Sequence, residues 1–360
     1  MTSEKDAPLD FHPEPLLKRP MHIPQRSRFP AIDAHNHLFG EYAPQDLIAV
    51  MDQTGVRTFV NVTGNAVLPY ENNTYTIQRR DIRIYLDNYV KAYPGRFAAL
   101  TMAEFAQWGD RTLLKANFLD RCIQVLEAHI SLGALGLKIT KELGLFFKDE
   151  EGSQLAVDDP RLSTIWQRCG ELGVPVLVHV SDPWGFFLPP DEKNEHYFTL
   201  REFPAWSFRK SFFSKQQLLD QRDRLLARHP HTRFLLAHVA NNPEDLDYVA
   251  RLLDHHPNAT IDFSARIDEL GRQPYTARDF FIKYQDRILF GVDMPITPEI
   301  YRCHFRFLET QDEYFDYPDY IGRWGRPRWR IYGLHLPDDI LRKIYFENAV
   351  ALFPPLAEAS

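Results

Sequence analysis

The chain has 360 residues, of which 44% are hydrophobic, enough to build a large apolar core. Its formal net charge of −7 argues against a nucleic acid as the main partner, because phosphate binding requires a concentrated basic surface. No apolar stretch reaches the roughly 18 residues that a membrane span requires.

The first 29 residues form a polar, proline-dotted segment that cannot be a continuous helix. We expect residues 1–29 to be an N-terminal arm, residues 30–353 a single catalytic domain, and residues 354–360 a C-terminal tail. The arm lacks the apolar stretch of a secretory signal. Three widely spaced cysteines without a Cys-x-x-Cys pair indicate a reducing compartment, so we expect a cytoplasmic protein without a thiolate metal site.

From residue 30 onward, apolar strand patterns alternate with amphipathic helix patterns. Strands are predicted at 31–34, 58–62, 96–102, 134–139, 174–180, 232–238, 259–263 and 287–293. Helices are predicted at 44–54, 71–93, 111–131, 160–172, 216–228, 243–255, 275–284 and 338–352. Eight such pairs predict an α/β fold of the (β/α)8 TIM-barrel type. A doubly wound open sheet is the rival, but it would usually carry a glycine-rich phosphate loop, and Gly40 and Gly64 stand alone.

Two connections are longer than ordinary loops between strand and helix. Residues 181–214 follow the fifth strand, and residues 294–337 follow the eighth. Both are rich in aromatic side chains, so we expect ordered lids over the C-terminal rim, where barrel enzymes carry their active sites.

Polar residues stand at the C-terminal ends of several predicted strands, where an apolar run stops. Since parallel strands end on the same rim, these side chains should converge. Neutral imidazoles together with a carboxylate suit Zn²⁺ or a similar divalent ion, and leave room for a water molecule. The residues are His35, His37, Lys138, His179, His238 and Asp293.

These motifs resemble the metal motifs of the amidohydrolase superfamily. The resemblance rests on Ile-Asp-Ala-His35-Asn-His37, Val-Leu-Val-His179, Phe-Leu-Leu-Ala-His238 and Ile-Leu-Phe-Gly-Val-Asp293-Met-Pro. The resemblance is closest to the amidohydrolase-related branch, which includes aminocarboxymuconate-semialdehyde decarboxylase and several lactonases. Residues 344–353 also resemble the C-terminal helix of that branch.

The resemblance implies that His35, His37, His179 and Asp293 hold one metal ion, usually zinc, with Mn²⁺ or Fe²⁺ as alternatives. It implies that His238 positions or deprotonates the water. In binuclear members a carboxylated lysine bridges two ions, and Lys138 occupies about that place. We favour an ammonium that binds an anionic substrate, because the closer branch is mononuclear.

Several further residues are weaker candidates for contact with the substrate or the site. Arg266 could clamp a carboxylate, or pair with Asp268 or Glu269 on the rim. Asp33 is a candidate hydrogen-bond partner of His35, and His196 and His304 could reach the site. A cluster of arginines and tryptophans in the second lid could recognise an anion or simply pack there: Arg323, Arg326, Arg328, Arg330, Trp324 and Trp329.

The sequence thus predicts a metal-dependent hydrolase acting on a small ester, lactone or amide-like carbonyl. Its partner is then a small molecule, an anionic one if Lys138 binds it as an ammonium. A non-oxidative decarboxylase on the same scaffold is the first alternative, although dihydroxybenzoate decarboxylases often show Glu-x-His where this chain has His-x-His. The second alternative is a catalytically silent barrel that binds a partner. The arm makes a homodimer plausible, since arms commonly cross a two-fold interface.

Overall fold

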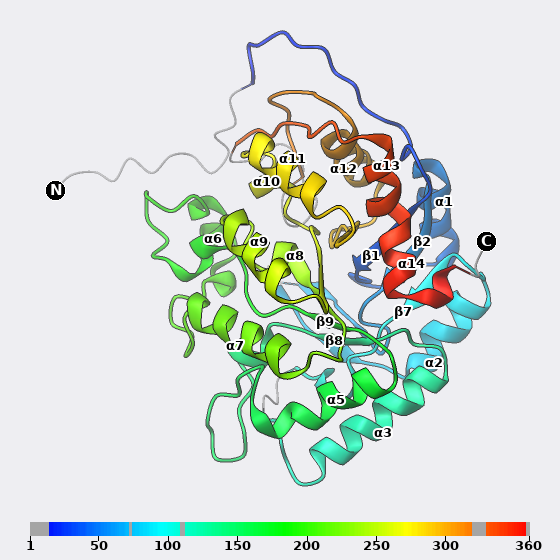
Figure 1. The fold of residues 1–360 in the computed structure, drawn as a ribbon, viewed down its shortest axis with the longest axis vertical. Coiled ribbons are helices and arrows are strands. Elements are labelled where there is room, and N and C mark those ends of the chain that lie inside the picture. The colour runs from blue at the N-terminus through cyan, green and yellow to red at the C-terminus, as the bar shows by residue number, and fades with distance from the viewer. Residues whose placement is uncertain (1–13, 72–73, 109–111, 319–328, 358–360) are drawn as a thin grey trace, which may run out of the picture.

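The fold is a set of parallel strands surrounded by helices, seen in a computed structural model that describes residues 14–71, 74–108, 112–318 and 329–357 (Figure 1). Eight parallel strands carry the architecture in these ranges, in two sheets ordered β1-β2-β7 and β12-β11-β10-β9-β8. They are β1 (Ala31–Asn36), β2 (Val56–Asn61), β7 (Phe97–Ala99), β8 (Leu137–Ile139), β9 (Val176–Val178), β10 (Phe234–Leu236), β11 (Ala259–Asp262) and β12 (Ile288–Leu289).

Hydrogen bonds outside the regular ladders join the two sheets at both seams. At one seam Thr101 bridges Leu137 in parallel. At the other, the Ala34 amide donates to the Phe290 carbonyl at 2.9 Å. The strands therefore follow one another in the circular order of a (β/α)8 barrel, with regular ladders in two arcs and a few hydrogen bonds between them.

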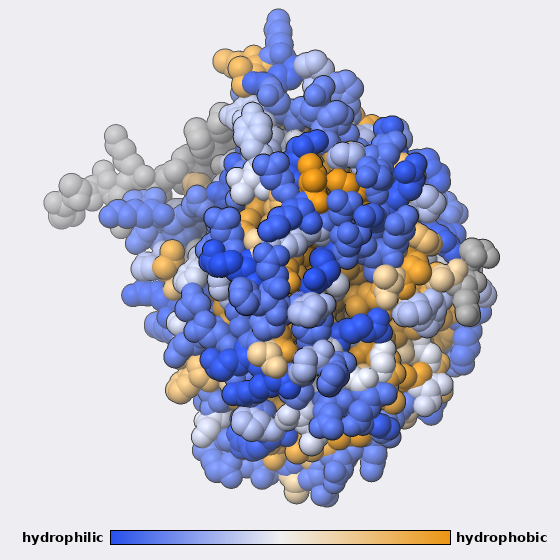
Figure 2. Space-filling view, viewed as in Figure 1, coloured by the Kyte–Doolittle hydropathy of each residue, from blue (hydrophilic) through white to orange (hydrophobic). Residues whose placement is uncertain are grey.

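Most helices follow the strands as the sequence predicts, because an amphipathic helix buries its apolar face against the strands and leaves its polar face outside. On the face shown in Figure 2, hydrophilic side chains predominate. The outer helices are α1 (Pro44–Thr54), α2 (Ile82–Tyr85), α3 (Phe118–Ser131), α5 (Ser163–Glu171), α7 (Lys215–Arg228), α9 (Leu246–His255), α11 (Pro274–Lys283), α12 (Pro298–Glu309), α13 (Asp338–Arg342) and α14 (Asn348–Leu352). None of the helices in the described residues could cross a membrane.

Apolar side chains fill the interior of the barrel. Ile32, Val60, Leu177 and Leu235 belong to one buried cluster, against which residues of α14 pack. The Arg233 guanidinium, just before β10, donates to the Leu352 carbonyl at 2.9 Å. The C-terminal helix therefore covers the N-terminal ends of the strands, and the opposite rim remains for a site.

The predicted helix over residues 71–93 is wrong in its first half. Two short antiparallel pairs occupy this stretch, β3 (Ala66–Val67) with β6 (Gln78–Arg79), and β4 (Tyr70–Glu71) with β5 (Thr74–Tyr75). Helical structure begins at Ile82, where the Asp81 carboxylate accepts from the Arg83 amide, and continues as a π-helix, Leu86–Lys91. A cap inside the amphipathic stretch thus sets the start of the helix.

The long connections also contain helices that were not predicted. Helix α12 lies within residues 294–337, and α6 (Tyr197–Glu202) lies within 181–214. The α12 helix begins with Pro298 in its first turn, and the Thr297 hydroxyl accepts from the Ile300 amide. The sequence Thr-Pro-Glu is a start signal that the loop prediction overlooked. Short helical turns occur elsewhere: α4 (Glu142–Leu145), α8 (Ala237–Ala240) and α10 (Ile267–Leu270).

Candidate metal centre

Polar side chains from separate strands meet at the C-terminal rim, around a cavity of about 350 Å³. The volume is within the usual range for small-molecule sites. The predicted residues that line the cavity are His37, Lys138, His179, His238, Arg266 and Asp293. His35 lies directly beneath them and is fully buried.

Among the residues that the structure describes, two groups have ligand-capable atoms within 4.8 Å of one another. One is His35, His37 and Asp293, and the other is His35, His238 and Asp262. Asp293 faces two histidines: its Oδ1 lies 3.4 Å from His37 Nε2, and its Oδ2 lies 3.5 Å from His238 Nε2. His179 belongs to neither group, although its ring centroid is 4.4 Å from that of His238.

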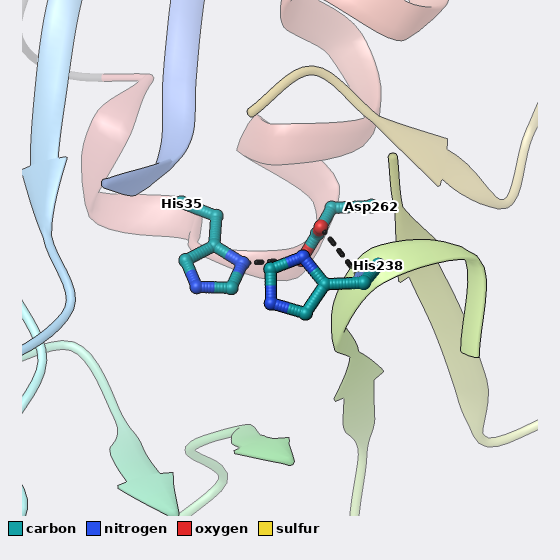
Figure 3. A group of neighbouring side chains, drawn as sticks. All are labelled: His35, His238 and Asp262. Atoms are coloured by element: carbon teal, nitrogen blue, oxygen red, sulfur yellow. Dashed lines mark hydrogen bonds and ion pairs between the residues drawn. The ribbon is translucent and has the colours of Figure 1, made fainter. Parts of the chain in front are cut away.

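Hydrogen bonds fix the tautomers of His35 and His238. His35 Nδ1 lies 2.8 Å from Asp262 Oδ2, and both side chains are fully buried (Figure 3). Burial alone would raise the pKa of Asp262. His35 and the hydrogen bonds to the carboxylate nevertheless hold this pKa below its usual value. The carboxylate only accepts, so His35 Nδ1 carries the proton. In the same way, His238 Nδ1 donates to the Ser264 carbonyl at 2.8 Å. Both histidines therefore present a lone pair at Nε2.

His37 is oriented by a hydroxyl. Its Nδ1 lies 3.1 Å from Thr63 Oγ1. The hydroxyl is also 3.2 Å from Asn61 Oδ1, to which it can only donate. Thr63 therefore accepts from His37 Nδ1, and His37 Nε2 presents its lone pair toward Asp293. Such partners behind a ligating nitrogen are a regular feature of protein metal sites.

His179 carries an orphaned nitrogen. Its Nε2 is buried and makes no hydrogen bond to any described residue. The nearest carboxylate oxygen is Asp182 Oδ1 at 3.5 Å. A buried polar atom without a hydrogen bond is costly, so such an atom on a cavity wall indicates a missing partner.

Burial keeps His37, His179 and His238 neutral. It lowers the pKa of His179 to about 3 and the pKa values of His37 and His238 well below their usual value. Neutral imidazoles are the form that binds metal ions. Burial also raises the pKa of Asp293.

Lys138 is a fully buried cation of the site. Burial lowers its pKa to about 8, and its Nζ lies 3.0 Å from His35 Nε2. Since His35 Nε2 presents a lone pair, Lys138 donates to it.

The backbone is strained where the site is built. His238 and Val239 have φ values of 57° and 55°, and Asp293 has a φ of 49°. Each non-glycine residue in this left-handed region costs about 1–3 kcal/mol and persists only where its surroundings determine the conformation. Asp262 helps to hold the backbone of His238 in this conformation, because its Oδ1 accepts from the His238 amide at 3.0 Å.

The sequence analysis missed Asp262, Asp182 and Lys141 as site residues. Asp262 ends β11, so the strand-end rule that found its neighbours would have found it. Asp182 lies beyond the end of β9, and its carboxylate contacts both Lys141 and Arg266. Arg266, which was a candidate, thus reaches the cavity in contact with Asp182.

Several of the weaker candidates do not line the cavity. Asp33 bonds to the His35 backbone and not to the His35 ring, and its carboxylate also accepts from Tyr301, Asn36 and the Val292 amide. His304 Nδ1 bonds to the Ile300 carbonyl within α12. His196 lies 3.7 Å from Glu269 Oε1. Arg323, Arg326, Arg328 and Trp324 fall outside the described residues.

Comparisons with known proteins identify the class that the barrel and its histidines define. A family model described as amidohydrolase matches residues 32–354, so the chain belongs to the amidohydrolase family. It is a metal-dependent enzyme of the amidohydrolase superfamily, as the motifs predicted. A search of curated proteins found no match.

Solved structures show the same fold at low identity. An uncharacterized TIM-barrel protein from Bordetella bronchiseptica is 15% identical, with a TM-score of 0.54 over 91% of this chain and 99% of that one. A 2,6-dihydroxybenzoate decarboxylase from Rhizobium is 17% identical, with a TM-score of 0.52 and the same coverage. A dihydroxybenzoic acid decarboxylase from a Polaromonas species, with bound manganese, is 16% identical, with a TM-score of 0.54 over 91% of this chain and 97% of that one. These likenesses support the (β/α)8 barrel.

Proposed function

We propose that the protein hydrolyses a small ester, lactone or amide-like carbonyl compound, with a divalent ion held by His35, His37, His179 and Asp293. The observation that carries the proposal is the convergence of His35, His37 and Asp293, whose ligand-capable atoms lie within 4.8 Å of one another. The orphaned His179 Nε2 on the same cavity supports a fourth ligand. This donor set suits Zn²⁺, with Mn²⁺ or Fe²⁺ as alternatives.

His238 is suited to handle the proton. Its Nδ1 proton is committed to the Ser264 carbonyl, and burial keeps the ring neutral, so Nε2 can accept a proton next to Asp293. When bound, the ion supplies polarisation of the substrate carbonyl and lowers the pKa of water. Lys138 and Arg266 supply positive charge on the cavity wall, where an anionic part of the substrate can bind.

The two long connections act as covers in this proposal. Phe186 and Trp206 from residues 181–214 line the cavity, and Pro295 lines it from residues 294–337. Apolar side chains over the rim exclude bulk water, which strengthens electrostatic interactions inside.

Decarboxylation of a small acid is the second candidate. The observation that favours it is the combination of aromatic walls with Lys138, Lys141 and Arg266, which suits a flat carboxylate. The same residues serve both reactions, so the products must decide between them.

Metal analysis and two substitutions test the proposal. We expect the purified protein to carry close to one divalent ion per chain, and His35→Ala and Asp293→Ala to lose it together with turnover. His255→Ala, at the exposed end of α9, is the matched control and should retain both. Full metal content and turnover in either site variant would contradict the ligand assignment.

A panel of lactones, esters, amides and small aromatic acids then distinguishes the two reactions. Ring opening or acid release without carbon dioxide supports hydrolysis. Stoichiometric carbon dioxide release from an acid supports the decarboxylase instead. An ion-loaded protein that converts none of these compounds would refute both candidates.

A further inference from the structure

A left-handed turn follows strand β10. Its four residues, 238 to 241, have φ values of 57°, 55°, 52° and 56°, and none of them is glycine. L-residues usually enter this region one at a time, because Cβ comes too close to the following carbonyl oxygen. Val239 is the most unusual of the four, since its side chain is branched at Cβ. Such a run persists only where contacts from outside determine its conformation.

Contacts from two other elements hold the two ends of this turn. At its start, Asp262 Oδ1 accepts from the His238 amide at 3.0 Å (Figure 3). At its end, Arg222 Nη1 of helix α7 donates to the Ala240 carbonyl. The backbone conformation of a residue restricts the rotamers of its side chain. Because His238 is the first residue of the turn, these two contacts together determine where its ring can lie.

Arg222 is itself held firmly. Its side chain is fully buried. Its Nε and Nη2 lie 3.0 Å and 2.7 Å from Asp223 Oδ1. Its Nη2 also lies 3.1 Å from the Tyr248 hydroxyl, which in turn donates to Asp223 Oδ2. The carboxylate compensates the buried charge, and one edge of the guanidinium is left for the turn. A buried ion pair is often no more stabilising than apolar side chains of the same volume, so stability alone does not account for this one.

We propose that Arg222 is a positioning residue for His238. By holding the Ala240 carbonyl, it keeps the turn left-handed. The His238 ring thereby stays bonded through Nδ1 to the Ser264 carbonyl, with Nε2 next to Asp293. The inference rests on the proposed function, in which His238 handles the proton, and gives a residue of an outer helix a part in that step.

Glycine substitutions test the proposal, because glycine adopts positive φ values without steric cost. Ala240→Gly, added to Arg222→Met, should restore what the loss of the guanidinium removes. Ala237→Gly is the matched control in the same background. Ala237 is also fully buried and loses the same methyl group, but its φ is not positive, so glycine there should restore nothing.

Exchange of the His238 Nδ1 proton with water measures the positioning in protein labelled with ¹⁵N-histidine. The hydrogen bond to the Ser264 carbonyl protects this proton, and loss of its signal in His238→Gln assigns it. Arg222→Met should accelerate the exchange about tenfold or more, as expected when a hydrogen bond from a charged donor is lost. Addition of Ala240→Gly should return the rate to within about threefold of that of the unmodified protein.

Kinetics with a compound that the enzyme converts distinguish positioning from a general loss of the fold. In Arg222→Met, kcat should fall about tenfold to hundredfold while KM changes little, because a misplaced group slows the reaction more than it weakens binding. Ala240→Gly should recover kcat and Ala237→Gly should not. All variants should retain the ion, because the described contacts of Arg222 include none of the four proposed ligands.

The exchange measurement needs neither ion nor substrate. A protein that takes up no divalent ion therefore refutes the proposed function and leaves the exchange experiment valid. An exchange rate in Arg222→Met within about twofold of the unmodified rate overturns the inference. Equal recovery with both glycines, recovery with neither, or a change in KM alone also overturns it. If Arg222→Met does not fold, Arg222→Lys takes its place with the same outcomes, since lysine keeps the charge beside Asp223 but loses the fork of donors.

Discussion

Asp262→Asn should weaken metal binding without removing a ligand. The two oxygens of Asp262 have separate tasks. Oδ1 lies 3.0 Å from the His238 amide, 3.1 Å from the Ser264 amide and 2.6 Å from the Ser264 hydroxyl. Oδ2 lies 2.8 Å from His35 Nδ1. An asparagine keeps its oxygen at the Oδ1 position, because three donors point there, and its amino group then faces His35.

That amino group reverses the His35 tautomer. It donates to Nδ1, so the ring proton moves to Nε2, which is the nitrogen that should bind the ion. Loss of such a partner typically reduces metal affinity by about 10–100-fold, or about 1.4–2.7 kcal/mol. The three hydrogen bonds to Oδ1 remain, so the free energy of unfolding of the ion-free protein should change by much less than that.

Competition with a chromophoric chelator measures the affinity for Zn²⁺, and urea unfolding of the ion-free protein measures stability. Asp33→Asn is the matched control, since Asp33 is a buried aspartate of β1 whose carboxylate is bonded to Tyr301, Asn36 and the Val292 amide and not to a histidine ring. It should lose stability while its affinity for Zn²⁺ stays within about threefold of the original. An affinity of Asp262→Asn within about twofold of the unmodified protein would refute the tautomer argument.

Three further predictions concern stability. Ser214→Ala removes the capping box of α7 and should cost about 0.5–2 kcal/mol in urea unfolding, whereas Ser214→Asn should cost less. Trp166→Ala, at a side chain 1% exposed against Phe105, should cost about 3–5 kcal/mol, and a smaller loss would mean that the site collapses. Burial lowers the pKa of Lys215 from 10.5 to about 8, so the unfolded chain binds more protons than the folded chain between these pH values. The free energy of unfolding of the unmodified protein should therefore rise by about 3 kcal/mol from pH 8 to pH 10.5, relative to that of Lys215→Met. No rise would contradict a buried cation at this position.

The strand-end rule explains why much of the site could be predicted from the sequence. A buried parallel strand is a run of apolar residues, and a polar residue that ends it marks both the length of the strand and the rim. His179 and His238 each follow such a run, and both line the cavity. The sequence also predicted the order of strands and helices, because hydrophobic periodicity carries it.

The remaining features depend on contacts between distant segments. Asp182 acts through Lys141 and Arg266, which are 41 and 84 residues away along the chain. No local pattern distinguishes it from an ordinary loop aspartate. Residues 74–79 have helical spacing but contain the short strands β5 and β6, and Tyr75 of β5 lines the cavity. Tertiary packing overrides local propensity there.

Burial prepares the site to bind an ion, but it also costs the fold part of its stability. The desolvation that keeps His37, His179 and His238 neutral makes them ready to bind an ion, but it also leaves lone pairs in an apolar environment. Left-handed backbone at His238 and Asp293 adds strain at the same place. An ion that binds only the folded chain recovers part of this cost through mass action, by about 4 kcal/mol at a thousandfold excess over its dissociation constant. The features that make the rim reactive are therefore also those that make the stability of the fold depend on what is bound there.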